Sequence, residues 1–182
     1  MSGLYLARHG ETDDNREPIR AQGITDTPLN RTGRSQAAEL AERVAPLGIL
    51  SLWSSDLSRA RETAEIVGDR LGLEPRLDPR LREANRGEWE GQRFIDVERE
   101  QPERYAAWRR AGEQFRFPGG ESLRDQLERV MAALADARAI GELPALVVCH
   151  GGTIRVALCA GDPRGLDAFH DFEVPNVAVF EV

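Results

Sequence analysis

Lysine is absent from this chain of 182 residues, and all 24 of its basic residues are arginines. The absence excludes Schiff-base chemistry on a lysine and the lysine-dependent type of phosphate-binding loop. A GC-rich genome is enough to explain the bias in composition. A phosphate group bound by this chain would therefore be held by guanidinium groups, backbone N–H groups and histidines.

Cysteine and histidine are also scarce. The two cysteines, Cys149 and Cys159, lie in apolar surroundings without the spacing of metal ligands, which favours a reducing compartment over a disulfide framework. The three histidines form no H-x-x-x-H pair, which argues against a structural zinc site. We expect neither a metal nor another cofactor.

No apolar stretch of the sequence approaches the length of a membrane span, and no basic region followed by an apolar segment indicates a signal peptide. We therefore expect a cytoplasmic protein with no membrane partner. The formal net charge of −7 argues against a nucleic-acid partner. The sequence leaves open whether two copies form a homodimer.

Short apolar runs alternate with helical patterns along the chain, which predicts an α/β fold: one doubly wound, mostly parallel sheet with helices on both faces. The clearest run, 145–149, is apolar throughout, as a central parallel strand should be. The pattern does not give the strand order. The predicted strands cover about 4–8, 48–53, 76–81, 145–149 and 177–182, and the predicted helices cover about 32–45, 57–71, a segment beginning near 102, 121–139 and 153–160.

The length suits one buried core, and neither a repeat nor a linker divides the chain. We expect a single domain, 1–182, with a helical excursion at about 84–120 that selects the substrate. Two readings of the aromatic and arginine side chains in this excursion stay open: they line a lid over the site, or they pack against one another as an ordinary core. The side chains in question are Arg86, Trp89, Phe94 and Trp108.

Two of the predicted strands end in a histidine followed by glycine, at His9 and His150. If these strands are neighbours, both imidazoles enter the crevice at the carboxyl edge of the sheet, where ligands of such folds bind. The glycines allow a close approach of the backbone, and the helix after His150 presents its free N–H groups. Arg8 and Arg59 add positive charge. The pattern predicts a site for a tetrahedral dianion such as phosphate, with His9 as the nucleophile.

Six separated motifs spread over nearly the whole chain support this interpretation. They are Arg8-His9-Gly10-Glu11-Thr12 with Asn15; Gly23, Asp26, Pro28-Leu29-Asn30, Gly33 and Gln36; Ser54-Ser55-Asp56-Leu57 with Arg59-Ala60 and Thr63-Ala64; Leu81-Arg82-Glu83 with Gly87 and Trp89-Glu90-Gly91; Pro118-Gly119-Gly120-Glu121-Ser122; and His150-Gly151-Gly152 with Arg155. In these motifs and in their order the chain resembles the histidine phosphatase superfamily, in its phosphoglycerate-mutase-like branch.

The resemblance implies that His9 attacks phosphorus to give a phosphohistidine, which water or another acceptor then discharges. It implies that Arg8, Arg59 and His150 hold the phosphoryl oxygens, so that catalysis is mostly positioning and electrostatic stabilisation. The substrate-binding residues that we expect beside them are Asn15, Gln22, Gly23 and Gly151.

The leaving alkoxide needs a proton, and its donor is less evident. Some members of the family place an aspartate directly after the second histidine, but this chain has Gly151 there. Glu83 occupies the position that matches the acid of the mutase-like branch. The resemblance therefore implies that Glu83 is the proton donor.

We expect a small phosphatase that hydrolyses small phosphorylated metabolites, similar to the α-ribazole phosphatases. Members with cofactor-dependent phosphoglycerate mutase activity carry further basic groups between the Trp-Glu-Gly and Pro-Gly-Gly motifs and a carboxyl-terminal tail. Here that region is short, its one adjacent basic pair is Arg109-Arg110, and no residue follows Val182. This predicts an open, less basic pocket in which water is the acceptor. The alternatives are a mutase and a non-catalytic module that binds phosphorylated ligands.

Overall fold

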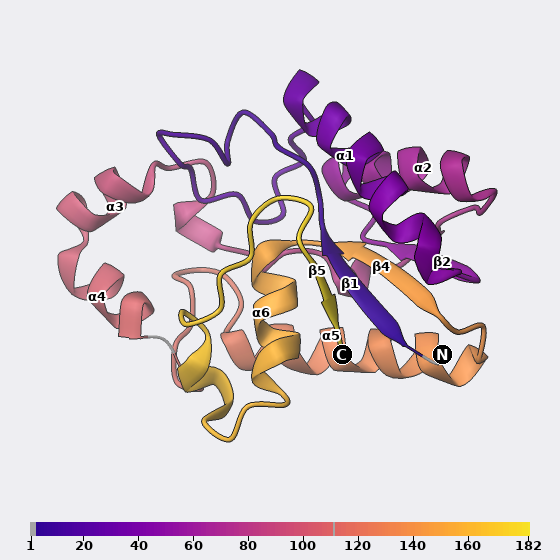
Figure 1. Ribbon diagram of the computed structural model, residues 1–182. Coiled ribbons are helices and arrows are strands. Elements are labelled where there is room, and N and C mark those ends of the chain that lie inside the picture. The colour runs from indigo at the N-terminus through magenta and orange to yellow at the C-terminus, as the bar shows by residue number, and fades with distance from the viewer. Residues whose placement is uncertain (1–2, 111) are drawn as a thin grey trace.

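The computed structural model describes residues 3–110 and 112–182, and a single five-stranded sheet forms its centre (Figure 1). The strands lie in the order β3-β2-β4-β1-β5, and all neighbours run parallel except β1 and β5, which are antiparallel. The predicted α/β fold with a mostly parallel sheet is confirmed. The strands are β1 (Leu4–Arg8), β2 (Ser51–Ser54), β3 (Arg76–Leu77), β4 (Ala145–Cys149) and β5 (Val179–Glu181).

Helices cover both faces of the sheet because its strands are apolar on both faces. The helices α1 (Arg31–Val44) and α2 (Ser58–Leu71) lie on one face, and α5 (Leu123–Ile140) and α6 (Gly151–Cys159) on the other (Figure 1). Successive residues of a strand point to opposite faces. Tyr5 and Ala7 of β1 accordingly pack in the core beneath α1 and α2, and Leu6 packs in the other.

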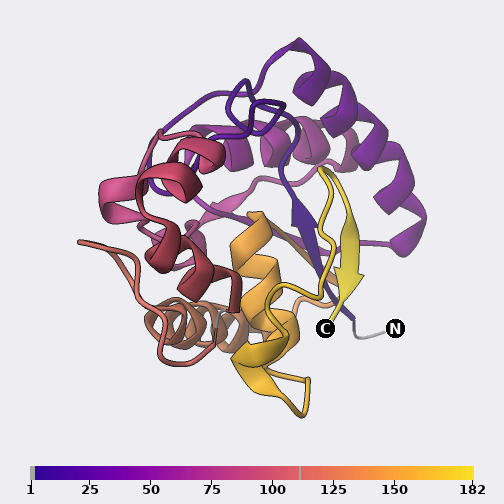
Figure 2. The same cartoon turned by 90° about the vertical axis from the view of Figure 1, so that its left-hand side faces the viewer.

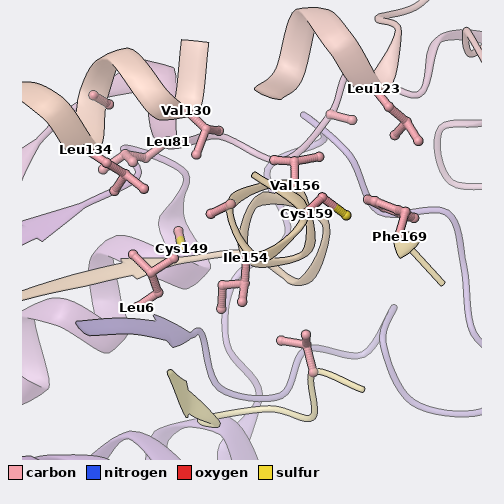
Figure 3. Close-up of a cluster of buried hydrophobic side chains, with 14 of the residues drawn as sticks. Leu6, Leu81, Leu123, Val130, Leu134, Cys149, Ile154, Val156, Cys159 and Phe169 are labelled. Carbon is pink, nitrogen blue, oxygen red and sulfur yellow. The ribbon is translucent and has the colours of Figure 1, made fainter. Parts of the chain in front are cut away.

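The core beneath α5 and α6 is the wider of the two. Figure 3 shows Leu6 and Cys149 of the sheet meeting Ile154 of α6, with Val130 and Leu134 of α5 beyond. The side chains in this close-up are almost completely buried. Packing on this face fixes α6, whose first residues directly follow His150, against the end of β4.

Two further helices, α3 (Phe94–Glu100) and α4 (Pro102–Arg110), project to one side of the sheet in the segment between β3 and α5 (Figure 1). Figure 2 shows this segment beside α6. The sequence analysis predicted α4 but not α3. Trp89 is fully buried against the rings of Trp108, Phe115 and Phe117, so it belongs to a core and not to a lid.

The predicted third strand, 76–81, was too long. It has only two residues, because the chain turns into a 3-10 helix at Pro79–Leu81. At the start of helix α2, Asp26 of a distant loop accepts a hydrogen bond from the N–H of Ser58 (2.6 Å). Within the described part of the chain, no helix has the length and apolar character needed to cross a bilayer.

Candidate active site

The strands β1 and β4 are neighbours and run parallel, with Arg8 opposite Cys149 in the register. The residues that follow them, His9 and His150, therefore leave the sheet at the same edge. Their imidazole centroids lie 5.2 Å apart, one ring edge toward the other. The predicted convergence of the two imidazoles is confirmed.

The His9 ring is held with one nitrogen available. Its Nδ1 lies 2.7 Å from the carbonyl oxygen of Gly10, and because a carbonyl only accepts, this nitrogen carries the proton. The lone pair is therefore on Nε2. Burial lowers the pKa of His9 well below its ordinary value, and the charges of Arg59 and Arg8 lower it further. His9 is thus a neutral imidazole with a free lone pair, which is the form a nucleophile needs.

Gly10, which follows the nucleophile, is packed tightly against another segment. A Cβ at Gly10 would lie 2.3 Å from the carbonyl oxygen of Gly33, so no side chain fits without a backbone shift. The N–H of Gly10 donates to Thr63 Oγ1 of α2 (3.1 Å). These contacts place the carbonyl that orients His9.

Two arginines flank the imidazoles, of which Arg59 is buried and Arg8 half-buried. Arg8 donates from Nη1 to the carbonyl of Val174 (2.6 Å), and in the described residues its Nε has no partner. Arg59 is fully buried and donates to the carbonyls of Gly23 (2.6 Å) and Thr25 (2.8 Å). Burial lowers the pKa of each arginine to about 10, so both stay charged at neutral pH.

His150 lies behind this arrangement and is not among the residues that line the cavity. Its Nδ1 accepts a hydrogen bond from Nε of Arg59 (3.2 Å), so its Nε2 carries the proton and donates to Ser55 Oγ (2.8 Å). In this arrangement His150 orients Arg59. A direct hydrogen bond to a phosphoryl oxygen, as the sequence analysis predicts, would need the Nε2–H to leave Ser55.

Glu83 is buried, and N–H groups surround its carboxylate. Oε1 accepts from the backbone N–H of Ala84 (2.9 Å) and from Nε2 of Gln126 (2.9 Å), and Oε2 accepts from the N–H of Gly152 (2.8 Å). Burial raises the pKa of Glu83, but the charge of Arg86 and these three donors outweigh burial and place it below its ordinary value. Gly152 must be glycine, because a Cβ there would lie 2.2 Å from Oε1.

His9, Arg8, Arg59 and Glu83 open into one cavity of about 290 Å³. Of the predicted substrate-binding residues, Asn15, Gln22 and Gly151 line it. Gly23 does not, and its carbonyl instead holds Arg59. The opposite side of the cavity, which we call the helical wall, consists of Arg86, Phe94, Trp108 and Arg109.

The cavity is more basic than the sequence analysis expected. Arginines 8, 20, 59, 86, 109 and 155 line it, and in the described part of the chain Glu83 is the one carboxylate among the lining residues. Helix α4 contributes Arg109 at the rim, where its exposed side chain places Nη1 3.4 Å from Nδ1 of His170. Arg110 lines other surface hollows and not this cavity.

Sequence reasoning did not assign the polar residues that support these groups. Gln126 lies on the buried face of α5, where a polar residue breaks the helical pattern, and that break is a usable signal. Ser55 is a cap-type residue whose pairing with His150 depends on the strand order. Asn176 donates from Nδ2 to the carbonyl of His9 (3.0 Å), and no local pattern marks it.

A larger hollow of about 800 Å³ lies along residues 112–119 and includes Arg110 and Asp167 in its lining. It is shallow and contains none of the groups that converge at the strand ends. The smaller cavity is the candidate active site, because the buried arginines, the free imidazole nitrogen and the carboxyl group meet there.

Comparison with known proteins shows the family of this chain. The family model of the histidine phosphatase superfamily (branch 1) matches residues 4–182. The chain is 43% identical over 157 residues to a protein of Enterobacter sp. (strain 638) named "Probable phosphoglycerate mutase GpmB", covering 83% of this chain and 70% of that protein.

Solved structures similar to this chain include phosphatases. A mycobacterial glucosyl-3-phosphoglycerate phosphatase in complex with VO3 superposes with a TM-score of 0.88 at 32% identity, covering 100% of this chain and 90% of that one. An Escherichia coli protein described as a candidate alpha-ribazole-5'-P phosphatase superposes with a TM-score of 0.84 at 27% identity. The match covers 99% of this chain and 90% of that one. With a family model that spans almost its whole length, this chain belongs to the histidine phosphatase superfamily.

Proposed function

We propose that this protein hydrolyses small phosphate monoesters through a phosphohistidine on His9. The observation that carries the proposal is the hydrogen bond from Nδ1 of His9 to the carbonyl of Gly10, which leaves the Nε2 lone pair in the cavity that Arg8 and Arg59 line. The charges of Arg8 and Arg59 match those of a phosphoryl dianion, and Asn15 has an unpaired Nδ2 donor among the described residues.

The chemistry proceeds in two steps. Nε2 of His9 attacks phosphorus, the P–N bond forms as the ester P–O bond breaks, and the leaving oxygen takes a proton from Glu83. Water then attacks the phosphohistidine, loses a proton to the Glu83 carboxylate, and the P–N bond breaks to release phosphate. Arg8 and Arg59 stabilise the charge on the phosphoryl oxygens in both steps.

Glu83 must be protonated when substrate is bound, although its pKa in the free protein is below the ordinary value. A phosphate dianion in the cavity raises the pKa of Glu83, because a nearby negative charge disfavours ionisation of a carboxyl group. Substrate binding therefore favours the acid form. Rates on alkyl phosphates should accordingly rise toward acidic pH.

Phosphoglycerate mutase activity is the second candidate, and the arginines of the helical wall favour it. A mutase must keep a bisphosphate bound while its phosphohistidine is shielded from water, and Arg109, in the lining of the cavity, offers a charge for this. The assay is the isomerisation of 3-phosphoglycerate with 2,3-bisphosphoglycerate present. Robust turnover there would rank the mutase above the phosphatase.

The natural substrate is, in this proposal, a small phosphorylated metabolite. The mycobacterial structure bears the name of a phosphatase of glucosyl-3-phosphoglycerate, and the Escherichia coli one names α-ribazole phosphate. We also propose that residues 1–182 form one domain in which the segment 84–120 selects the substrate. That two copies form a homodimer stays a prediction. Analytical ultracentrifugation measures the mass of the protein in solution and so tests it.

The test of the proposal is mass spectrometry after brief incubation with substrate. We expect a phosphoryl adduct on His9 that is absent from the His9→Ala variant. Phosphate binding without an adduct or turnover would contradict it and would support the non-catalytic binding module.

A further inference from the structure

Arg86 is an arginine of the cavity that the proposed chemistry does not use. Its side chain is only 11% exposed, and its guanidinium lies over two aromatic rings, 5.5 Å from the centroid of Phe94 and 5.2 Å from that of Phe117. Contact with two aromatic faces attracts the charged group and limits its movement. The guanidinium is therefore held in the wall by the protein itself.

The hydrogen bonds of this guanidinium are incomplete. Among residues 3–110 and 112–182, Nε and Nη1 of Arg86 have no acceptor. Nη2 lies 3.9 Å from Oε2 of Glu83, which is an attractive separation between charges but too long for a hydrogen bond. Leaving buried donors of a charged group unpaired is costly, and a ligand that supplies acceptor oxygens removes this cost.

Of the other five arginines of the cavity, Arg109 is exposed and lies 3.4 Å from Nδ1 of His170, and the remaining four are engaged elsewhere. Arg8 and Arg59 balance the two charges of the phosphoryl group. Arg20 donates to the carbonyl of Gly91, and Arg155 donates from Nε to the carbonyl of Phe172. Arg86 is thus a surplus positive charge with free donors, in a cavity whose net charge is opposite in sign to that of the whole chain.

The position of Arg86 relates it to one part of the substrate. Glu83 gives its proton to the leaving oxygen, so it marks the side of the cavity where the alcohol portion lies. Arg86 is next to Glu83, at Oε2. A guanidinium there faces the alcohol portion and not the transferred phosphoryl group.

We propose that Arg86 is a specificity-determining residue that binds a second anionic group, a carboxylate or another phosphate, on the alcohol portion of the substrate. The inference rests on the proposed phosphatase function. Substrates of this class would gain affinity from charge-assisted hydrogen bonds that neutral alkyl phosphates cannot make.

The test compares matched substrates. Hydrolysis of 2-phosphoglycolate is measured beside its neutral isostere 2-phosphoglycolamide, beside ethyl phosphate, and beside the bisphosphate of ethane-1,2-diol. We expect kcat/KM for the carboxylate or the bisphosphate to exceed that for the amide about 10- to 100-fold, the size of a hydrogen bond between charged groups. Whichever of the two, the carboxylate or the bisphosphate, has the larger increase in kcat/KM over the amide identifies the second anion. Equal values for all of them would overturn the assignment.

Variants locate the effect. In Arg86→Met, whose flexible side chain fits between the rings, the preference should fall to less than about threefold, mainly through KM, because ground-state binding is lost. Arg86→Lys should retain part of it. The matched control is Arg104→Met, an exposed arginine outside the cavity, which should retain the full preference.

Two outcomes separate this inference from the function beneath it. If Arg86→Met lowers the rates on charged and neutral substrates by one common factor, Arg86 serves only Glu83 and the inference fails, while the phosphatase stands. If no substrate is turned over and His9 acquires no phosphoryl group, the proposed function fails and the inference with it. Should Arg86→Met not fold, as judged by circular dichroism, the wild-type preference and Arg86→Lys decide the question.

Discussion

The two sides of the cavity are built differently. On the strand-end side, His9, Arg59 and His150 are almost fully buried, and their polar atoms other than Nε2 of His9 bond to backbone carbonyls, to Ser55 or to one another. On the helical wall, Phe94 lies stacked on Trp108 with centroids 4.8 Å apart, and Arg109 is exposed.

This difference suits the strand-end side to the reaction and the helical wall to the choice of substrate. Groups tied to the backbone at the end of a sheet cannot move without disrupting its pairing, so the reacting atoms keep their geometry. Side chains that hold one another by ring contacts can be exchanged without disturbing the sheet. Substitutions should therefore abolish the reaction on one side and alter substrate preference on the other.

The largest expected contrast is between two histidines of the same cavity. His9→Ala removes the nucleophile and should lower kcat/KM by about 10⁴- to 10⁶-fold, as the loss of other covalent nucleophiles does. His170→Ala, on the wall side, should change it by less than about tenfold. Steady-state assays of the two purified variants check the contrast. Comparable losses would contradict the division between the two sides.

Glu83, which lies where the two sides meet, should show the next largest effect. Glu83→Gln removes the proton donor and should lower the rate on alkyl phosphates by about 10²- to 10⁴-fold. An activated aryl phosphate, whose leaving group scarcely needs a proton, should lose much less. Equal losses on the two substrates would remove Glu83 from this role.

Gln126 should affect the pH profile more than the maximal rate. Its amide donates to Oε1 of Glu83 and so stabilises the carboxylate. In Gln126→Leu the pKa of Glu83 should rise, because a donor to the charged form is lost. The acid form then persists to higher pH, and the decline of the alkyl phosphatase rate with rising pH should begin later.

The control for this shift is Gln114→Leu, an exposed glutamine outside this cavity. Its pH profile should match that of the wild type. A Gln126→Leu profile shifted toward lower pH, or unshifted, would show that Gln126 does not stabilise the Glu83 carboxylate.

The smallest effect should come from the adjacent pair on α4. Arg109 lines the cavity and Arg110 does not, so the two substitutions differ only in the side of the helix they change. Arg109→Met should lower kcat/KM about 3- to 10-fold, as expected for a partly exposed charge, and Arg110→Met less than twofold. Equal effects would mean that the charge acts at long range and not within the cavity.

The sequence predicted best what depends on short patterns. Apolar runs that end in His9 and His150 indicated both strands, and the structure confirms that they are neighbours. Helix α3 was missed because, of its seven residues, only Val97 is buried, so no periodic apolar face exists to detect.

Features that depend on distant segments could not be predicted. The cap of α2 comes from Asp26, more than thirty residues before it, while Ser55, an equally good cap by type, pairs with His150. The strand order β3-β2-β4-β1-β5 depends on how the crossover helices pack. The presence of Arg109 and not Arg110 in the cavity likewise follows from the rotation of α4 about its axis, which its weakly amphipathic sequence does not define.

The nucleophile and its neighbour are secured by residues from the opposite end of the sequence. Asn176 binds the carbonyl of His9 across 167 positions, and the carbonyl of Val174 receives Arg8. A nascent chain on the ribosome therefore exposes the reactive imidazole early but cannot fix it until residue 176 has emerged. Contacts of such long range form late in folding, so the imidazole takes up its final orientation after the sheet has paired.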